Sequence, residues 1–144
     1  MKHARLILGI VGAVGAMQVT AVACTCDLPN PHQTVAQQVR QARADARAVF
    51  SGRVLRITKA AYFLKVEFSV ETVWKGSLPS KVVISTGRGG GDCGYRFEVG
   101  ERYLVYATGA NNVRLGTNIC QRTASFTASA ADLAELGKPK RPRR

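Results

Sequence analysis

The residues whose chemistry is most informative are four cysteines. Cys24 and Cys26 are separated by one residue, whereas Cys93 and Cys120 each stand alone in the chain. An even number of cysteines in a small domain is typical of disulfides formed in an oxidising compartment. A bond between Cys24 and Cys26 would close a very tight ring, which disulfide geometry disfavours. Each of these two is therefore predicted to reach either Cys93 or Cys120, and spacing alone leaves both crossings open.

Two other uses of the cysteines compete with disulfides. A structural zinc site usually needs paired C-x(2–4)-C units, which Cys93 and Cys120 lack, and His32 is the only histidine beyond the first 23 residues. A zinc ion of the protein's own is therefore disfavoured. Lipid attachment to the Cys24 thiol is the second alternative, because a small residue precedes it. It would leave an odd number of thiols, and Ala21 stands where such processing sites usually carry leucine.

The first 23 residues have the pattern of a secretory signal peptide. A basic start at residues 1–5 precedes an uncharged apolar run at 6–17, and the segment ends in Ala21-Val22-Ala23. The apolar run is shorter than a membrane-spanning helix needs, and we expect no membrane span elsewhere. Cleavage after Ala23 would leave a mature chain of residues 24–144. We expect this chain to be secreted or periplasmic, and therefore extracellular. Its first residue would be Cys24.

A free α-amine on Cys24 would have its own chemistry. Such an amine has a pKa of about 7.7–8, so a neutral fraction is available at neutral pH, and a metal ion would favour it. The amine and the neighbouring carbonyl oxygen could together chelate a zinc ion held by another protein, displacing the water that occupies its open position. The sequence contains no clear catalytic motif, so an enzyme is disfavoured. His32 has no identifiable catalytic neighbours, and the glycines of residues 87–92 lack the Gly-Lys-Ser/Thr ending of a phosphate loop.

The formal charge of +12 is concentrated at the ends of the chain. Cleavage of the leader would remove Lys2 and Arg5, and residues 138–144 carry five further positive charges with two prolines and no apolar residue. This tail is predicted to be disordered and to bind an anionic glycan, lipid or cell-wall polymer; its charged members are Lys138, Lys140, Arg141, Arg143 and Arg144. Specific nucleic-acid binding is disfavoured because, although Tyr62, Phe63 and Tyr95 are candidate stacking residues, Phe68, Trp74 and Tyr103 are expected in the core.

Short β-strands must position these residues. Alternation of apolar and polar residues predicts a half-exposed strand over residues 64–71, and further strands are expected at 49–57, 82–84 and 102–108, with weaker ones at 113–115 and 117–120. Gly52 predicts a bulge or bend in the first of these strands. Helices are expected within residues 34–49 and after a capping box at Ser129. The predicted fold is mainly β, a five-stranded OB-like closed barrel with flanking helices and two disulfides over residues 24–137.

Several segments of the mature chain resemble the netrin-like domain, most closely the inhibitory domain of the tissue inhibitors of metalloproteinases. The resemblance spans nearly all of residues 24–137 and is carried by Cys24-Thr25-Cys26, residues 48–54, Val73-Trp74-Lys75-Gly76, Asp92-Cys93-Gly94-Tyr95, residues 100–106 and Thr117-Asn118-Ile119-Cys120.

The resemblance implies an OB-fold, the pairing Cys24–Cys93 with Cys26–Cys120, and inhibition of zinc metalloendopeptidases by a monomeric protein with no cofactor of its own. Cys24 would chelate the target's zinc, and Thr25 would enter the target's first primed-side pocket. The inhibitory ridge implied in this way consists of Cys24, Thr25, Cys26, Asp27, Leu28, Gly90, Gly91 and Asp92. The alternative is a netrin-like module that inhibits nothing and binds a protein or polyanion at the cell surface or matrix.

Overall fold

The computed structural model describes residues 24–27, 30–109 and 114–144 of the chain. The predicted leader and Leu28 lie outside these residues. One antiparallel sheet dominates the fold, with the strand order β3-β2-β1-β4-β5. Its strands are β1 (Ala48–Lys59), β2 (Leu64–Lys75), β3 (Lys81–Thr86), β4 (Arg102–Ala107) and β5 (Ala124–Ser125).

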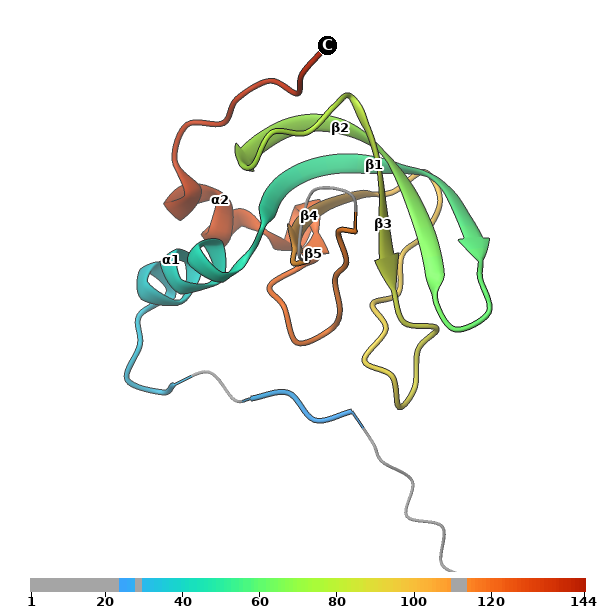
Figure 1. Ribbon diagram of the computed structural model, residues 1–144. Coiled ribbons are helices and arrows are strands. Elements are labelled where there is room, and N and C mark those ends of the chain that lie inside the picture. The colour runs from blue at the N-terminus through green and yellow to red at the C-terminus, as the bar shows by residue number, and fades with distance from the viewer. Residues whose placement is uncertain (1–23, 28–29, 110–113) are drawn as a thin grey trace, which may run out of the picture.

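The two longest strands bend strongly, as Figure 1 shows. β1 and β2 pair over most of their length, with register shifts that include one between Ser51 and Gly52. A Cβ atom on Gly52 would lie 2.6 Å from the backbone oxygen of Ser69, so only glycine permits this close approach. The bend that the sequence predicts at Gly52 is therefore present.

Two helices pack beside the sheet at the left of Figure 1. α1 (Val35–Asp45) begins with a capping box, in which the Gln37 backbone N–H donates to the Thr34 hydroxyl and the Thr34 N–H donates to the Gln37 side chain. α2 (Ala130–Leu136) follows a single 3-10 turn, η1 (Phe126–Ala128). The capping box predicted at Ser129 is wrong, because the Ser129 hydroxyl instead donates back to the Ser125 carbonyl at 2.7 Å.

The sheet carries a separate apolar cluster on each face. Alternation along β4 places Tyr103 and Val105 in one cluster and Leu104 and Tyr106 in the other. The first cluster includes a chain of edge-to-face aromatic contacts in which Phe68 bridges two other rings, with centroid distances of 5.4 and 5.5 Å. The second cluster joins the sheet to α1 and α2. The core positions expected for Phe68, Trp74 and Tyr103 are confirmed.

The strand ladder is not closed into a barrel. The edge strands β3 and β5 do not pair with each other, and residues 114–123 contribute only isolated bridges, from Gly116 to Ser85 and to Thr108. The weak strand expected at residues 117–120 is absent, and the fifth strand is β5. A mainly β fold with five antiparallel strands, two helices and two disulfides is thus confirmed, whereas the closed barrel is not.

The C-terminal tail lies along the half of β2 that β3 leaves uncovered. The backbones of Val73 and Lys140 exchange two hydrogen bonds of 2.8 and 2.7 Å, and the Arg143 N–H donates to the Leu78 carbonyl. The indole N–H of Trp74 donates to the Gly137 carbonyl just before the tail begins. This ordered pairing differs from the disordered tail that the sequence predicts, because an open strand edge offers backbone partners that composition does not reveal.

Candidate functional site

The two disulfides bring three distant segments together. Cys24 is bonded to Cys93 and Cys26 to Cys120, the pairing implied by the family resemblance, with Cα–Cα distances of 5.2 and 5.1 Å. The N–H of Ile119 donates to the Cys93 carbonyl at 2.9 Å, which joins the two receiving segments directly. We call residues 24–27, 87–94 and 118–120 together the cysteine ridge.

The disulfides lie against each other and offer no metal ligands. The sulfur of Cys120 is 4.0 Å from the sulfurs of both Cys24 and Cys93. Three clustered sulfurs resemble a metal site, but every one of them belongs to a disulfide, so none supplies the thiolate that a metal ion requires. The Cys24 sulfur in this bridge is equally unavailable for a lipid thioether.

Most predicted ridge residues are exposed and close together. Thr25 and Asp27 are exposed, and Cys24 is half-buried against its disulfide partner. Gly90, Gly91 and Asp92 are also exposed, in the loop that ends at Cys93. Apart from Leu28, the predicted inhibitory residues therefore share one surface of the molecule.

The glycine-rich loop of the ridge is organised by Asp92. Its carboxylate accepts backbone N–H groups from Arg88 at 2.6 Å, Gly89 at 2.9 Å and Gly94 at 3.0 Å. These hydrogen bonds, the one from Arg88 first, hold the pKa of Asp92 below its usual value. A Cβ atom on Gly94 would lie 2.4 Å from the backbone of Gly87, so the closed base of the loop needs glycine. A glycine content this high is typical of a loop, but the organisation of the loop by Asp92 was not predicted.

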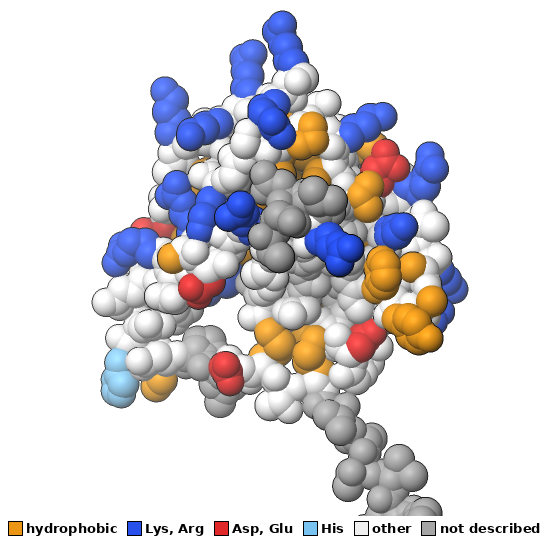
Figure 2. All heavy atoms as spheres, in the orientation of Figure 1, with side chains coloured by type: hydrophobic (Ala, Val, Ile, Leu, Met, Phe, Trp, Pro, Cys, Tyr) orange, Lys and Arg blue, Asp and Glu red, His pale blue; other side chains and the backbone are white. Residues whose placement is uncertain are grey.

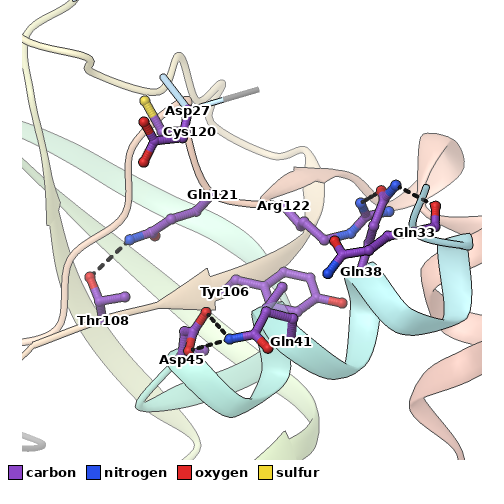
Figure 3. Close-up of a pocket in the computed structure, with 12 residues that line it drawn as sticks. Asp27, Gln33, Gln38, Gln41, Asp45, Tyr106, Thr108, Cys120, Gln121 and Arg122 are labelled. Carbon is purple, nitrogen blue, oxygen red and sulfur yellow. Dashed lines mark hydrogen bonds between the residues drawn. The ribbon is translucent and has the colours of Figure 1, made fainter. Parts of the chain in front are cut away.

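An open cleft of about 330 Å³ lies between α1 and the segment that carries Cys120 (Figure 3). Asp27 and Cys120 form one end of it, so the cleft is continuous with the cysteine ridge. Amide side chains from α1 and from the 120–122 segment line its walls. The Gln41 amide donates to the Asp45 carboxylate at 3.0 Å, and the Gln121 amide donates to the Thr108 hydroxyl at 2.9 Å.

A charged network lies behind the ridge and was not predicted. The Asp132 carboxylate accepts hydrogen bonds from Arg122 at 2.6 and 2.9 Å and from the Tyr106 hydroxyl at 2.8 Å, while Arg122 also donates to Gln38 of α1 at 3.0 Å. The hydrogen bond to Asp132 raises the pKa of Arg122. Burial raises the pKa of Tyr106, and the Asp132 carboxylate adds to this shift. The network therefore connects α1, β4 and α2 to the residues that follow Cys120.

The five tail cations are exposed on the C-terminal segment, which lies at the end of the molecule opposite residues 24–27 in Figure 1. In Figure 2, Lys and Arg side chains stand at the top of the molecule, where the tail runs in Figure 1. Arg143 also donates through its guanidinium to the Ser77 carbonyl at 3.3 Å. Nearby, the Lys75 ammonium donates to the carbonyls of Arg43 and Ala44 at the end of α1.

His32, the other candidate from the sequence, is not part of the cysteine ridge. His32 is exposed, and its backbone N–H donates to the Asn30 side chain. Among the described residues, none of the helices has the length and apolar character needed to cross a membrane.

The chain was also compared with known proteins. No protein-family model matches it, and no curated protein is similar to it.

Proposed function

We propose that the mature chain inhibits a zinc metalloendopeptidase through the cysteine ridge. One observation supports this most strongly: two disulfides fix both cysteines of the C-x-C segment beside an exposed, internally hydrogen-bonded loop. A chelating terminus gains affinity when it is held rigid before binding, because less conformational entropy is lost on association. We also propose that the bent sheet is an OB-like fold, as the family resemblance implies.

In this mechanism, cleavage after Ala23 frees the α-amine of Cys24. The amine and the Cys24 carbonyl oxygen occupy the open coordination position of the target's zinc and exclude the attacking water. The Thr25 side chain enters the adjoining substrate pocket. Residues Gly90 to Asp92 make the second contact, and the Asp92 hydrogen bonds keep this loop in one conformation.

The decisive experiment compares the mature chain with a version that carries one additional alanine before Cys24. Both are assayed against a panel of zinc endopeptidases, after mass measurement shows that each contains two disulfides. The mature form should inhibit and the extended form should not, because the extension removes the free amine from Cys24. Equal inhibition by both forms would refute chelation.

The pH dependence provides a second test of the same mechanism. The amine must lose its proton to bind zinc, so the inhibition constant should rise about tenfold for each pH unit below the amine pKa of about 7.7–8. An inhibition constant that does not change between pH 8 and pH 6, against a protease that is itself active throughout, would contradict chelation by the amine.

A second candidate function is binding of a polyanion by the tail. The backbone pairing of Lys140 with Val73 supports it, because a tail held in place presents its cations with little further loss of entropy. If the protein is a binding module without inhibitory activity, we propose that the basic tail is its binding surface.

The tail hypothesis is tested by retention on an anionic resin as the salt concentration rises. One variant lacks residues 138–144, and a matched variant replaces the five tail cations with glutamine and so keeps the backbone that pairs with β2. Both should elute at lower salt than the unaltered chain. Unchanged elution of the glutamine variant would exclude the tail as the binding site.

A further inference from the structure

The turn between β1 and β2 presents an unusual exposed apolar surface. The turn is closed by the Ala60 N–H, which donates to the Phe63 carbonyl at 2.9 Å. Tyr62 at its tip is 87% exposed, Phe63 is 38% exposed, and Val83 on the neighbouring strand β3 is 51% exposed. We call this surface, with the cations described next, the hairpin patch; its members are Tyr62, Phe63, Lys65, Val83, Arg88 and Arg114.

The patch surrounds a shallow hollow. Phe63, Val83, Ile84 and Leu115 line an open cavity of about 790 Å³, and Lys65 and Arg114 are also among its lining residues. The hollow is thus apolar in its lining and carries two positive charges. Figure 2 shows apolar and basic side chains side by side on the right of the molecule, where this hairpin lies in Figure 1.

The formal charge of this surface is positive. Arg88 belongs to it because its guanidinium donates to the Ala61 carbonyl of the turn at 3.2 Å. The sheet register places Glu67 beside Val83, and this carboxylate has Arg56 as a neighbour at 4.0 Å. The other nearby carboxylate, that of Asp92, is already bound by three backbone N–H groups. The patch has three cations, Lys65, Arg88 and Arg114, against these two carboxylates, so its formal charge stays positive.

We propose that the hairpin patch docks on an anionic lipid bilayer. An exposed tyrosine at the tip of a turn, a neighbouring phenylalanine and a ring of cations combine an apolar insertion point with attraction to negative headgroups. Val83 favours lipid over nucleic acid, because its exposed aliphatic side chain can contact acyl chains but provides no flat ring for base stacking. The proposal is independent of zinc chelation.

The patch is separate from the basic tail. The hairpin adjoins the Leu64 end of β2, whereas the tail pairs with Val73 near the other end of that strand. Nine residues of extended strand span about 30 Å, before any allowance for bending. The two basic surfaces can therefore be tested separately.

The experiment uses the emission of a tryptophan placed in the patch, Tyr62→Trp, in the full mature chain with all five tail cations replaced by glutamine. Vesicles of phosphatidylcholine with phosphatidylglycerol should shift this emission to shorter wavelength, and vesicles of phosphatidylcholine alone should not. The matched control is Val99→Trp, because Val99 is 61% exposed but lies between Glu98 and Glu101. Its emission should not move. The native Trp74 is buried and contributes a constant background.

A charge variant then measures the electrostatic contribution. Lys65→Gln combined with Arg114→Gln should weaken partitioning about 30-fold, because each cation near an anionic surface contributes about 1 kcal/mol. The absence of an emission shift, or an equal shift at Val99, would overturn the proposal. A shift produced by single-stranded DNA or soluble polyglutamate but not by vesicles would also overturn it and would identify a different partner.

Discussion

The two ends of the described chain are held to the sheet by different forces. The N-terminal segment 24–27 contains no buried residue and is attached through two covalent bonds, Cys24–Cys93 and Cys26–Cys120. The C-terminal region from Arg122 onward is attached by burial and hydrogen bonding, with Leu136 in the apolar cluster between the helices and Asp132 in the charged network.

This difference follows from what each end exposes. A short segment that stays largely at the surface cannot bury enough apolar surface to offset the entropy of ordering it. Disulfides fix such a segment without covering it. The C-terminal region has apolar side chains to bury, so it needs no covalent link. The following predictions test whether the two ends respond as differently as this comparison requires.

The largest effect is expected from Cys26→Ser combined with Cys120→Ser. The bond joins residues separated by 94 positions, and in the loop-entropy account its removal destabilises the fold by about 4 kcal/mol. Denaturant unfolding followed by Trp74 fluorescence measures this loss. Hydrogen exchange should also show faster opening at residues 118–120 than in β1 of the same variant.

The matched control for this double substitution is Cys24→Ser combined with Cys93→Ser, which removes the other bond. It should cost a similar free energy, because the loop closed is nearly as long, with a separation of 69. A loss below about 1 kcal/mol for both variants would show that non-covalent contacts already hold the ridge.

A smaller loss is expected when the charged network is broken by Asp132→Asn. The substitution leaves Arg122 without its carboxylate and weakens the bond from the Tyr106 hydroxyl, at a cost of about 2–3 kcal/mol. Thermal unfolding measures it. Asp45→Asn is the control, because the Asp45 side chain is exposed and bonds only to Gln41 among the contacts we find in the described residues; it should change stability by less than about 0.5 kcal/mol. Equal losses of stability in the two variants would show that the charged network does not hold the C-terminal region in place.

Sequence patterns predicted those elements of the fold that depend on neighbouring residues alone. The alternation around Phe68 predicted β2, because side chains of a half-buried strand face opposite sides in turn. The charged network could not be predicted, since Asp132 and its partner Tyr106 are 26 residues apart. The pairing of Lys140 with Val73 was equally invisible. It depends on β3 leaving that edge of β2 open, which is a property of the assembled sheet.

The candidate site was predicted to a similar extent. C-x-C spacing favoured a crossing to the two isolated cysteines, and the family resemblance supplied the pairing that the structure contains. The five glycines at residues 87–94 are typical of a loop. They did not reveal that Asp92 organises it, because a carboxylate that binds nearby backbone N–H groups has the same sequence signature as a solvated one.

The smallest effect on global stability is expected from Asp92, whose contacts are confined to the ridge loop. Its lowered pKa means that the loop is stabilised fully at pH values above the ordinary value of 3.8 and loses that contribution as the pH falls through the lower value of the folded chain. The amide resonances of Arg88, Gly89 and Gly94 should therefore titrate together, with a midpoint below 3.8, in an NMR pH series. Asp92→Asn should abolish this titration and speed hydrogen exchange at the same three amides, while the midpoint of denaturant unfolding shifts less than in Asp132→Asn. A titration midpoint at or above 3.8 would mean that the backbone N–H groups do not stabilise the ionised carboxylate. A global loss as large as that of Asp132→Asn would mean that the loop is coupled to the core, and the contrast between the disulfide-bonded ridge and the buried C-terminal network would no longer hold.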